Sequence, residues 1–409
     1  MLKVKNVVIL SDFGHINGGS SHAAIASSVA LADHGYKVLF FTAVKPVAPI
    51  LDHDNVRVLC TDQVDILNNP LRVQAACQGI WNVKAAATFS RLLNFVDPSD
   101  TVIHIHSWVK ALSSSVVHVA LAKGFKVVVT LHDYFSVCPN GGFFNYQNLR
   151  ICTLSPLSPA CLLQNCDVRS YSHKLWRVLR QMVQRRVGGL PSHITQYIVP
   201  SDFAERVHNP FLPRDARIYH ISNPVNVRKS LPVDVAENTM FLFIGRLSQE
   251  KGAHLFAKAA EEASAAVTFV GGGPCLSNIK KICPQARVTG WLDEEGVMQH
   301  LRKARALVVP SLSYETQGVT VLEAAAAGVP SIVSDVVCAR EAVTDGITGL
   351  WFRGGDVGDL LRKIRALQDP NITRGMGSAS YDKYWEKPFT IEKHVDELAT
   401  CYERVLYGK

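Results

Sequence analysis

Long apolar runs are missing from this sequence of 409 residues, which argues against a membrane-spanning protein. No segment approaches the roughly 18 uncharged apolar residues that a transmembrane helix requires. The first apolar run, Val7 to Leu10, is too short for the hydrophobic region of a signal peptide and ends at Ser11 and Asp12. We therefore expect a cytoplasmic protein that can still touch the inner face of a membrane.

Nucleic-acid-binding motifs are also missing. The chain carries a formal net charge of +8, which favours anionic partners such as nucleotides and phospholipid headgroups. It has no zinc-finger spacing, no aromatic RNA-binding motif and no long tract of Lys and Arg. The sequence therefore predicts no nucleic-acid partner.

Metal-ligand spacings are equally scarce. Cys138, Cys152, Cys161 and Cys166 cluster along the chain but lack the Cys-x2-Cys pair of common zinc sites. We expect thiols there, with a structural zinc ion as the alternative. The segment Asp52-His53-Asp54 has the form of a metal-binding Asp-x-Asp, but loop carboxylates are mostly just solvated. We expect neither a metal ion nor a cofactor in the functional site.

The loop after the first expected strand lacks the GxGxxG and GK[ST] patterns of nicotinamide and ATP sites. Gly18 and Gly19 instead stand just before a helix. Paired glycines at this position let backbone N–H groups approach a ligand phosphate. The alternative is a plain turn between a strand and a helix.

Short strands of Val, Ile and Phe alternate with helices, which predicts an α/β fold with parallel sheets. The alternation restarts after Asn223-Pro224, so we expect two Rossmann-like, doubly wound domains facing each other across a cleft, residues 1–222 and 223–385. A final segment, 386–409, has apolar residues at helical spacing and is expected to pack back on the first domain. Ligands of such sheets bind beyond the carboxyl ends of the strands. The expected strands are 6–10, 37–42, 57–60, 101–105, 126–131 and 196–199, then 240–244, 266–270, 286–288, 306–309 and 331–334.

Two glycine-containing loops follow strands of the second half. In the first, Arg246 and Lys251 lie between Gly245 and Gly252, where both cations could reach one diphosphate. The alternative is a solvated basic loop. In the second, Gly271, Gly272 and Gly273 precede Pro274, a pattern of close backbone approach to a ligand or of a sharp turn.

Two glutamates and a glycine mark the segment after the expected strand 306–309. Glu315 lies in the loop, and Gly318 opens a helix whose first N–H groups, those of Val319 and Thr320, are free for a phosphate. Glu323 lies within that helix among small Ala residues, where a carboxylate is costly unless it has hydrogen-bond donors. Ribose hydroxyl groups would supply them. The alternative for Glu323 is a surface position on an amphipathic helix.

Histidines end two expected strands of the first half. His132 follows the strand 126–131, beside the expected cleft, and a buried structural histidine is the alternative. His104 and His106 share one face of their strand because side chains alternate along it. We expect His106 to face the acceptor and His104 to be structural.

Taken in order, these segments resemble glycosyltransferase family 4. The residues that carry the resemblance are Gly245-Arg246-Leu247, Glu250-Lys251-Gly252, Gly271-Gly272-Gly273-Pro274, Gly290-Trp291, Glu315 and Glu323-Ala324 through Gly328-Val329-Pro330. The resemblance covers nearly the whole chain. It implies a retaining enzyme of the two-domain GT-B fold that needs no metal ion and moves a sugar from a nucleotide carrier to a glycan or lipid-linked acceptor in polysaccharide or glycoconjugate biosynthesis.

The same resemblance implies a role for each site residue. Arg246 and Lys251 bind the diphosphate, Glu315 and His132 contact the donor sugar, and Glu323 binds the ribose. The chain departs from the family pattern at Gln317, which replaces the usual Phe, at Asn226 in the hinge, and at 337–340, which replaces a glycine-rich turn. Gln317 leaves the identity of the sugar open. Two alternatives stand beside this function: a catalytically silent subunit that binds nucleotide sugars, and an epimerase of the same fold.

The segment from Lys174 to Arg186 predicts a helix rich in basic and apolar residues, with no acidic residue between Asp167 and Asp202. One interpretation is a basic amphipathic helix that binds an anionic membrane surface. The alternative is an ordinary domain helix with a basic outer face. The residues concerned are Lys174, Arg177, Arg180, Arg185 and Arg186, interleaved with Leu175, Trp176, Leu179, Met182 and Val183.

Overall fold

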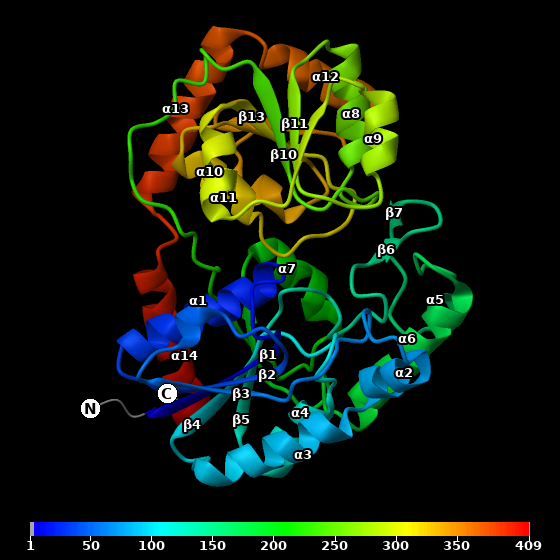
Figure 1. The fold of residues 1–409 in the computed structure, drawn as a ribbon, viewed down its shortest axis with the longest axis vertical. Helices are drawn as coiled ribbons and strands as arrows, with labels where there is room; N and C mark the ends of the chain where they lie inside the picture. The colour runs from blue at the N-terminus through cyan, green and yellow to red at the C-terminus, as the bar shows by residue number, and fades with distance from the viewer. Residues whose placement is uncertain (1–3, 409) are drawn as a thin grey trace. The chain divides into compact units, whose positions relative to one another are not determined.

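A computed structural model describes residues 4–408 of the chain (Figure 1). It divides into two compact units. The N-terminal unit holds the residues up to Gly142, Leu154–Pro224 and the residues from Phe389 onward. The C-terminal unit holds Phe143–Thr153 and Val225–Pro388. Each unit is an α/β domain with its own parallel sheet, so the predicted fold class is confirmed.

The N-terminal unit is built on a seven-stranded parallel sheet in the order β3-β2-β1-β4-β5-β8-β9. Its strands are β1 (Asn6–Phe13), β2 (Lys37–Val44), β3 (Val56–Cys60), β4 (Thr101–Ile105), β5 (Lys126–Thr130), β8 (Gln196–Val199) and β9 (Arg217–His220). Its helices are α1 (Gly19–Asp33), α2 (Arg72–Ile80), α3 (Val83–Leu92), α4 (Ser115–Ala122), α5 (Pro159–Leu163), α6 (Tyr171–Arg186), α7 (Asp202–His208) and α14 (Ile391–Tyr407).

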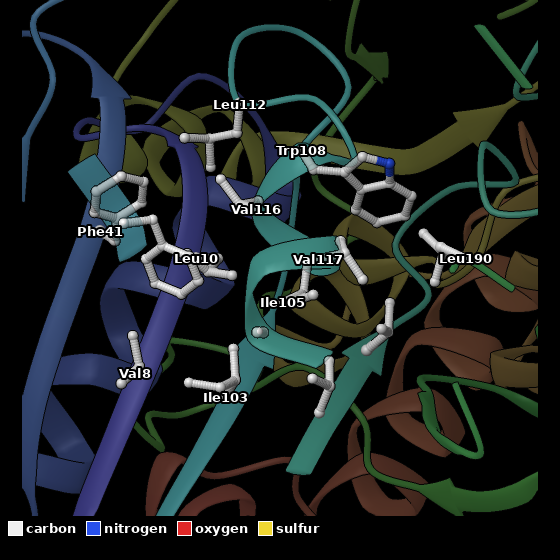
Figure 2. Packing of buried hydrophobic residues seen from close by; sticks show 14 of the residues in the cluster. Val8, Leu10, Phe41, Ile103, Ile105, Trp108, Leu112, Val116, Val117 and Leu190 are labelled. Carbon is white, nitrogen blue, oxygen red and sulfur yellow. The ribbon is translucent and has the colours of Figure 1, made fainter. Parts of the chain in front are cut away.

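Alternation along β1 explains why this sheet has helices on both faces. Val8 and Leu10 point into one core, where α3 and α4 cover the sheet, and Figure 2 shows them beside Ile103, Ile105 and Val117. The intervening β1 residues point into the opposite core, which α1 and α14 cover. Both faces are therefore buried, as expected for a parallel sheet of nearly continuous apolar strands.

The C-terminal unit repeats this plan with six parallel strands in the order β12-β11-β10-β13-β14-β15. The strands are β10 (Met240–Ile244), β11 (Val267–Val270), β12 (Arg287–Gly290), β13 (Ala304–Val309), β14 (Ser331–Ser334) and β15 (Gly349–Phe352). The helices are α8 (Ala253–Glu262), α9 (Leu276–Ile282), α10 (Glu294–Arg302), α11 (Val319–Ala326), α12 (Val357–Ala366) and α13 (Pro370–Glu386).

A short antiparallel hairpin of β6 (Phe144–Asn145) and β7 (Arg150–Ile151) interrupts the N-terminal unit in the sequence. Its residues, Phe143–Thr153, cluster with the C-terminal unit. The sequence pattern carries no signal for this hairpin, because its strands are only two residues long. The predicted first domain, residues 1–222, included this hairpin.

The prediction that α6 turns a basic face outward is wrong for Lys174, Arg177 and Arg180. Lys174 and Arg180 are 1% and 5% exposed, and Arg177 forms an ion pair with the buried carboxylate of Asp167 at 2.6 Å. The exposed side chains of the helix include apolar ones, Leu175 and Leu179 among them, and the two arginines at its end, Arg185 and Arg186. The reason is that the loops beneath the helix present carbonyl oxygens, thiols and a carboxylate, which the cations bind.

No helix within residues 4–408 is both long enough and apolar enough to cross a membrane.

Candidate functional site

The loop after β10 holds the two cations predicted to bind the diphosphate, each beside a carboxylate. The guanidinium group of Arg246 forms an ion pair with Glu250, whose Oε1 also accepts a hydrogen bond from Ser248 Oγ at 2.8 Å. The Arg246 side chain is 58% exposed, whereas that of Glu250 is 8% exposed. Glu250 therefore anchors an arginine whose other nitrogen atoms remain open to an anionic ligand.

Lys251 lies deeper and contacts a predicted site residue directly. Its Nζ donates to Glu315 Oε1 at 2.7 Å, and the same oxygen accepts from Ser311 Oγ at 2.7 Å. Burial by itself raises the pKa of Glu315, but Lys251 and the hydrogen bond from Ser311 outweigh it and bring this pKa below its ordinary value. Glu315 is thus ionised at neutral pH. The structure brings Lys251 and Glu315 together from the loops after β10 and β13.

Helix α11 follows this pair and begins without a side-chain cap. Its N-cap residue is Gly318, so the N–H groups of Val319 and Thr320 at the first turn have no side-chain acceptor from the cap position. The partial positive charge of a helix N-terminus favours an anion there. A Cβ on Gly318 would come within 2.8 Å of Ala339, so close packing requires glycine at this position. Gln317 precedes it and is partly buried.

Glu323 lies one turn further along α11, in a contrasting environment. Burial, and secondarily the charge of Glu294, raises its pKa to about 7. Within residues 4–408 its carboxylate makes no hydrogen bond or ion pair, which agrees with the expectation that it needs donors from a ligand. Glu315 and Glu323 are therefore two carboxylates of one segment with pKa values shifted in opposite directions.

The glycines after β11 serve mainly to let two loops pack against each other. A Cβ on Gly271 would come within 2.0 Å of Gly245 O, and one on Gly273 within 2.5 Å of Leu247 O. The backbone N–H of Leu247 donates to Gly272 O at 3.0 Å. These glycines fix the loop that carries Arg246, and positive φ angles at Gly245, Gly271 and Gly273 require the absence of a side chain.

In the N-terminal unit, His106 and His132 form a buried pair at the ends of β4 and β5. His106 Nδ1 and His132 Nε2 are 2.9 Å apart, and their rings are stacked. Burial, then the nearby His394, lowers the pKa of His132 to about 3, and burial also lowers that of His106 well below its ordinary value. Both rings are therefore neutral, and a hydrogen bond joins them. Among residues 4–408, His106 Nε2 is buried and has no hydrogen-bond partner.

His104 lies in a different chain of hydrogen bonds. Its Nδ1 contacts Tyr402 Oη and its Nε2 contacts Thr130 Oγ1, both at 2.7 Å. With both nitrogen atoms occupied by side chains of α14 and β5, this histidine joins structural elements.

Gly18 and Gly19 begin α1. Gly18 is the N-cap residue with a φ of 135°, and no side-chain cap is present. Added Cβ atoms at either glycine would meet open space within 4 Å. The backbone at Gly18 and Gly19 is accordingly accessible from solvent, whereas Ser21 in the first turn is buried.

The sequence analysis did not single out two carboxylates that lie at strand ends of the N-terminal unit. Asp12, at the end of β1, accepts from the backbone N–H groups of Lys110, Ala111 and Leu112 at 2.9 Å each. Asp133 follows His132, and burial raises its pKa to about 6. The signal that could have found them is position, because each lies at the carboxyl end of a parallel strand.

The four clustered cysteines separate in the structure. Cys138, Cys161 and Cys166 belong to the N-terminal unit, where Cys161 and Cys166 contact the ammonium group of Lys174, whereas Cys152 belongs to the hairpin in the C-terminal unit. In the part of the chain from 4 to 408, no three His, Cys, Asp or Glu side chains are arranged to hold a metal ion.

Comparison with known proteins shows which family the segment carrying these residues is similar to. Residues 238–369, which include Arg246, Lys251, Glu315 and Glu323, match the family described as glycosyl transferases group 1. An uncharacterised glycosyltransferase of Methanocaldococcus jannaschii is 29% identical over 163 residues, which are 37% of this chain and 41% of that protein. The first curated relatives are each matched over less than half of their length.

Solved structures share the fold over the whole chain. A sucrose-phosphate synthase of Thermosynechococcus elongatus matches with a TM-score of 0.73 and 20% identity, covering 99% of this chain and 100% of that chain. The Anabaena protein HepE, solved in complex with UDP and glucose, matches with a TM-score of 0.66 and 16% identity, over 98% of this chain and 99% of that chain. The chain thus has the GT-B fold, and its segment 238–369 matches the family model of group 1 glycosyl transferases.

Proposed function

We propose that this chain is a retaining glycosyltransferase of family 4 that moves a sugar from a nucleotide-sugar donor to a glycan or lipid-linked acceptor without a divalent metal ion. The observation that carries the proposal is the contact between Lys251 and Glu315 immediately before the uncapped N-terminus of α11. Cationic, anionic and backbone donor groups thus meet in the segment that matches the family.

The proposed chemistry follows from where charge develops. As the bond between the anomeric carbon and the phosphate oxygen breaks, negative charge grows on the nucleoside diphosphate. Arg246, Lys251 and the N–H groups at Val319 and Thr320 stabilise that charge, as preorganised donors do in other sites. The metal ion used by other transferases is then unnecessary.

The remaining groups hold the sugar and the nucleoside. Glu315 accepts hydrogen bonds from hydroxyl groups of the donor sugar, and Glu323 accepts them from the ribose. His132 is neutral and donates one hydrogen bond to the sugar. The acceptor hydroxyl attacks the anomeric carbon from the face that the phosphate leaves, and its proton passes to the departing phosphate. The crystal structure of HepE in complex with UDP-glucose supports that nucleotide sugar as the first donor to test.

The test is nucleotide release in the presence of donor and acceptor, with and without EDTA. We expect EDTA to leave the rate unchanged. Lys251→Ala should lower turnover by about 10²–10³ and weaken nucleoside diphosphate binding, while Glu315→Gln should lose turnover and keep that binding. Lys281→Ala, an exposed lysine on α9, is the matched control.

Full inhibition by EDTA that Mg²⁺ or Mn²⁺ reverses would refute the metal-free mechanism. Binding of the donor without release of nucleotide would favour a silent binding subunit. Conversion of the donor to a different nucleotide sugar would favour an epimerase.

We also infer that the protein reaches a lipid-linked acceptor by binding the membrane through the exposed face of α6. That face is apolar, not basic as the sequence predicted. Tyr171, Leu175, Leu179 and Met182 recur along one face of the helix and are 37–47% exposed. Helix α2 packs beside α6 through Trp176, whose indole nitrogen donates to Ala76 O at 3.2 Å. Soluble domains rarely leave such a continuous apolar stripe uncovered.

Charge favours an anionic phospholipid bilayer as the occupant of this face. Helices α2, α5 and α6 contain no Asp or Glu. Arg185 and Arg186 end α6 and line a hollow of about 490 Å³ together with Ser192 and His193, groups that suit a lipid phosphate. Apolar side chains that enter the interface and arginines at headgroup level together give binding that depends on lipid charge.

Flotation of the full chain with vesicles tests this surface. We expect binding to vesicles that contain phosphatidylglycerol and little binding to pure phosphatidylcholine. Leu175→Gln with Leu179→Gln, and separately Arg185→Glu with Arg186→Glu, should each reduce binding severalfold. Leu276→Gln with Arg287→Glu, exposed positions of the C-terminal unit, should not. Equal vesicle binding by all variants would refute the proposal that this face of α6 binds membranes. If variants that no longer bind vesicles still release nucleotide, the transferase proposal is unaffected.

A further inference from the structure

Lys174 is the most deeply buried cation of α6 and lies apart from the proposed transfer site. Its side chain is among the largest fully buried ones of the described chain and is 1% exposed. With Arg177 and Arg180 it forms the inward face of the helix, at the spacing that places residues on one side. A buried ammonium group is costly unless acceptors surround it.

The acceptors of Lys174 are sulfur atoms. Its Nζ lies 3.4 Å from Cys161 Sγ and 3.3 Å from Cys166 Sγ. The nearby carboxylate of Asp167 is bound instead by Arg177, at 2.6 Å. Burial opposes the charge on Lys174, but the two sulfur atoms outweigh it, so that the pKa of the ammonium group lies above its ordinary value.

This geometry joins two features of a reactive thiol. Burial raises the pKa of the Cys166 thiol, and the contact with Lys174 opposes that shift by stabilising the thiolate, which is the reactive form of cysteine. Because Cys161 and Cys166 share one nitrogen atom, their sulfur atoms lie within about 7 Å of each other. Only four residues separate them in the chain, and Leu163 between them is 79% exposed. Side-chain rotation and a small movement of this surface segment bring the pair to bonding distance.

We propose that Cys161 and Cys166 form an oxidation site in which Lys174 activates one thiol toward a hydroperoxide and the second thiol resolves the product as a disulfide. In the first step the thiolate sulfur attacks the peroxide, the O–O bond breaks, and sulfenic acid and water form after protonation of the leaving oxygen. In the second step the other thiol attacks the sulfenic sulfur, an S–S bond forms and water leaves. The two thiols lose two electrons in total, and the peroxide gains them.

Oxidation removes both sulfur acceptors of Lys174 at once. The ammonium group is then buried without the partners that offset its burial, so the contacts between α6 and the 161–166 segment weaken. This consequence is independent of the proposed transferase activity, since no residue of the oxidation site belongs to the segment 238–369.

The test is graded treatment of the reduced full chain with hydrogen peroxide, followed by alkylation, trypsin digestion and mass spectrometry. The tryptic peptide 151–169 contains Cys152, Cys161 and Cys166. We expect it to lose two hydrogen atoms and two alkylation sites, with fragment ions that place the link between Cys161 and Cys166, and we expect dithiothreitol to reverse the change. Exposed Cys77 reports the oxidant dose, and Cys275, which is buried without a lysine contact, should stay reduced.

Variants separate the roles of the three residues. Lys174→Met should slow the oxidation by about tenfold, the effect of one pKa unit at the thiol. Cys161→Ser keeps the contact of Lys174 with Cys166 and should give a sulfenic acid that dimedone traps, with no disulfide. If Cys161 and Cys166 can still be fully alkylated after a peroxide dose that oxidises Cys77, the proposal is overturned. Oxidation of Lys174→Met at the wild-type rate would overturn the role of the lysine.

Discussion

Two glutamates of one segment show how strongly the pKa of a carboxyl group depends on the residues around it. Glu315 is paired with Lys251 and has a lowered pKa, whereas Glu323, eight residues later, has a pKa raised to about 7 by burial. The raised value means that the fold prefers protonated Glu323. Its contribution to stability is therefore complete at pH values below about 4.5 and is lost as the pH rises through 7.

We predict that Glu323→Gln stabilises the nucleotide-free protein at high pH. Glutamine cannot ionise, so the free energy of unfolding at pH 8 should exceed that of the wild type by on the order of 1 kcal/mol after allowance for solvent screening. The difference should shrink toward zero near pH 4. Urea unfolding at several pH values measures it, with the exposed Glu262→Gln as the control.

Nucleotide binding should show the opposite dependence on pH. Ribose hydroxyl groups donate to the ionised carboxylate, so the affinity of the wild type for a nucleoside diphosphate should rise as the pH passes through 7. Glu323→Gln should bind more weakly, without that rise. A wild-type affinity that does not vary between pH 6 and pH 8 would contradict the ribose assignment.

Residue-scale contacts were the least predictable part of the site. The sequence singled out Arg246, Lys251, Glu315 and Glu323 because each stands at a strand end or on an apolar helix. It could not reveal that Lys251 contacts Glu315, since these residues are far apart in the chain and meet only through the order of β10 and β13. The pairing of His106 with His132 was hidden for the same reason.

At the scale of elements, α14 shows how a terminal helix becomes part of a distant core. Its buried face, Val395, Leu398, Cys401 and Tyr402, packs into the core formed by β1 and α1. Tyr402 also donates to or accepts from His104 inside the sheet, at 2.7 Å. The spacing of apolar residues predicted the helix, but the hydrogen bond depends on the fold.

We predict that Tyr402→Phe lowers the free energy of unfolding by about 1–3 kcal/mol, the usual cost of leaving a buried polar partner unsatisfied. The ring volume is kept, so packing should change little. Tyr407→Phe, on the same helix and 42% exposed, should change stability by less than about 0.5 kcal/mol. Chemical denaturation of both variants gives the comparison, and equal stabilities would show that the hydrogen bond contributes nothing measurable.

Helix α6 marks the limit of pattern-based prediction for elements. Amphipathicity correctly located a helix, but it did not determine which face points inward, because a basic face normally meets water. Here the loops at 136–140 and 161–167 present oxygen and sulfur acceptors, so the polar face is the buried one. Those acceptors come from irregular segments, whose sequences have no hydrophobic periodicity from which their position could be predicted.

At the scale of the whole molecule, the alternation of strands and helices was the most predictable property. It depends on composition and spacing over many residues, so no single contact can overturn it. Each unit has its own sheet and its own pair of apolar cores: those around β1 and β4 in one, and those around β10 and β13 in the other. Such units can respond separately to a ligand.

We predict that a nucleoside diphosphate protects the C-terminal unit selectively. All the residues proposed to hold the diphosphate and ribose lie in 245–323, so binding should slow amide hydrogen exchange in the loop 245–252 and across α11. Exchange in β1, β4 and β5 should change much less. At 100 times its dissociation constant the ligand stabilises the state that binds it by about 2.7 kcal/mol, which slows exchange through local opening about a hundredfold.

UDP is the first probe, with uridine as the control that lacks the phosphates. Lys251→Ala should reduce the protection by UDP and leave the weak effect of uridine unchanged. Protection centred on the N-terminal sheet would show that the nucleotide binds elsewhere, and would refute the proposed donor site.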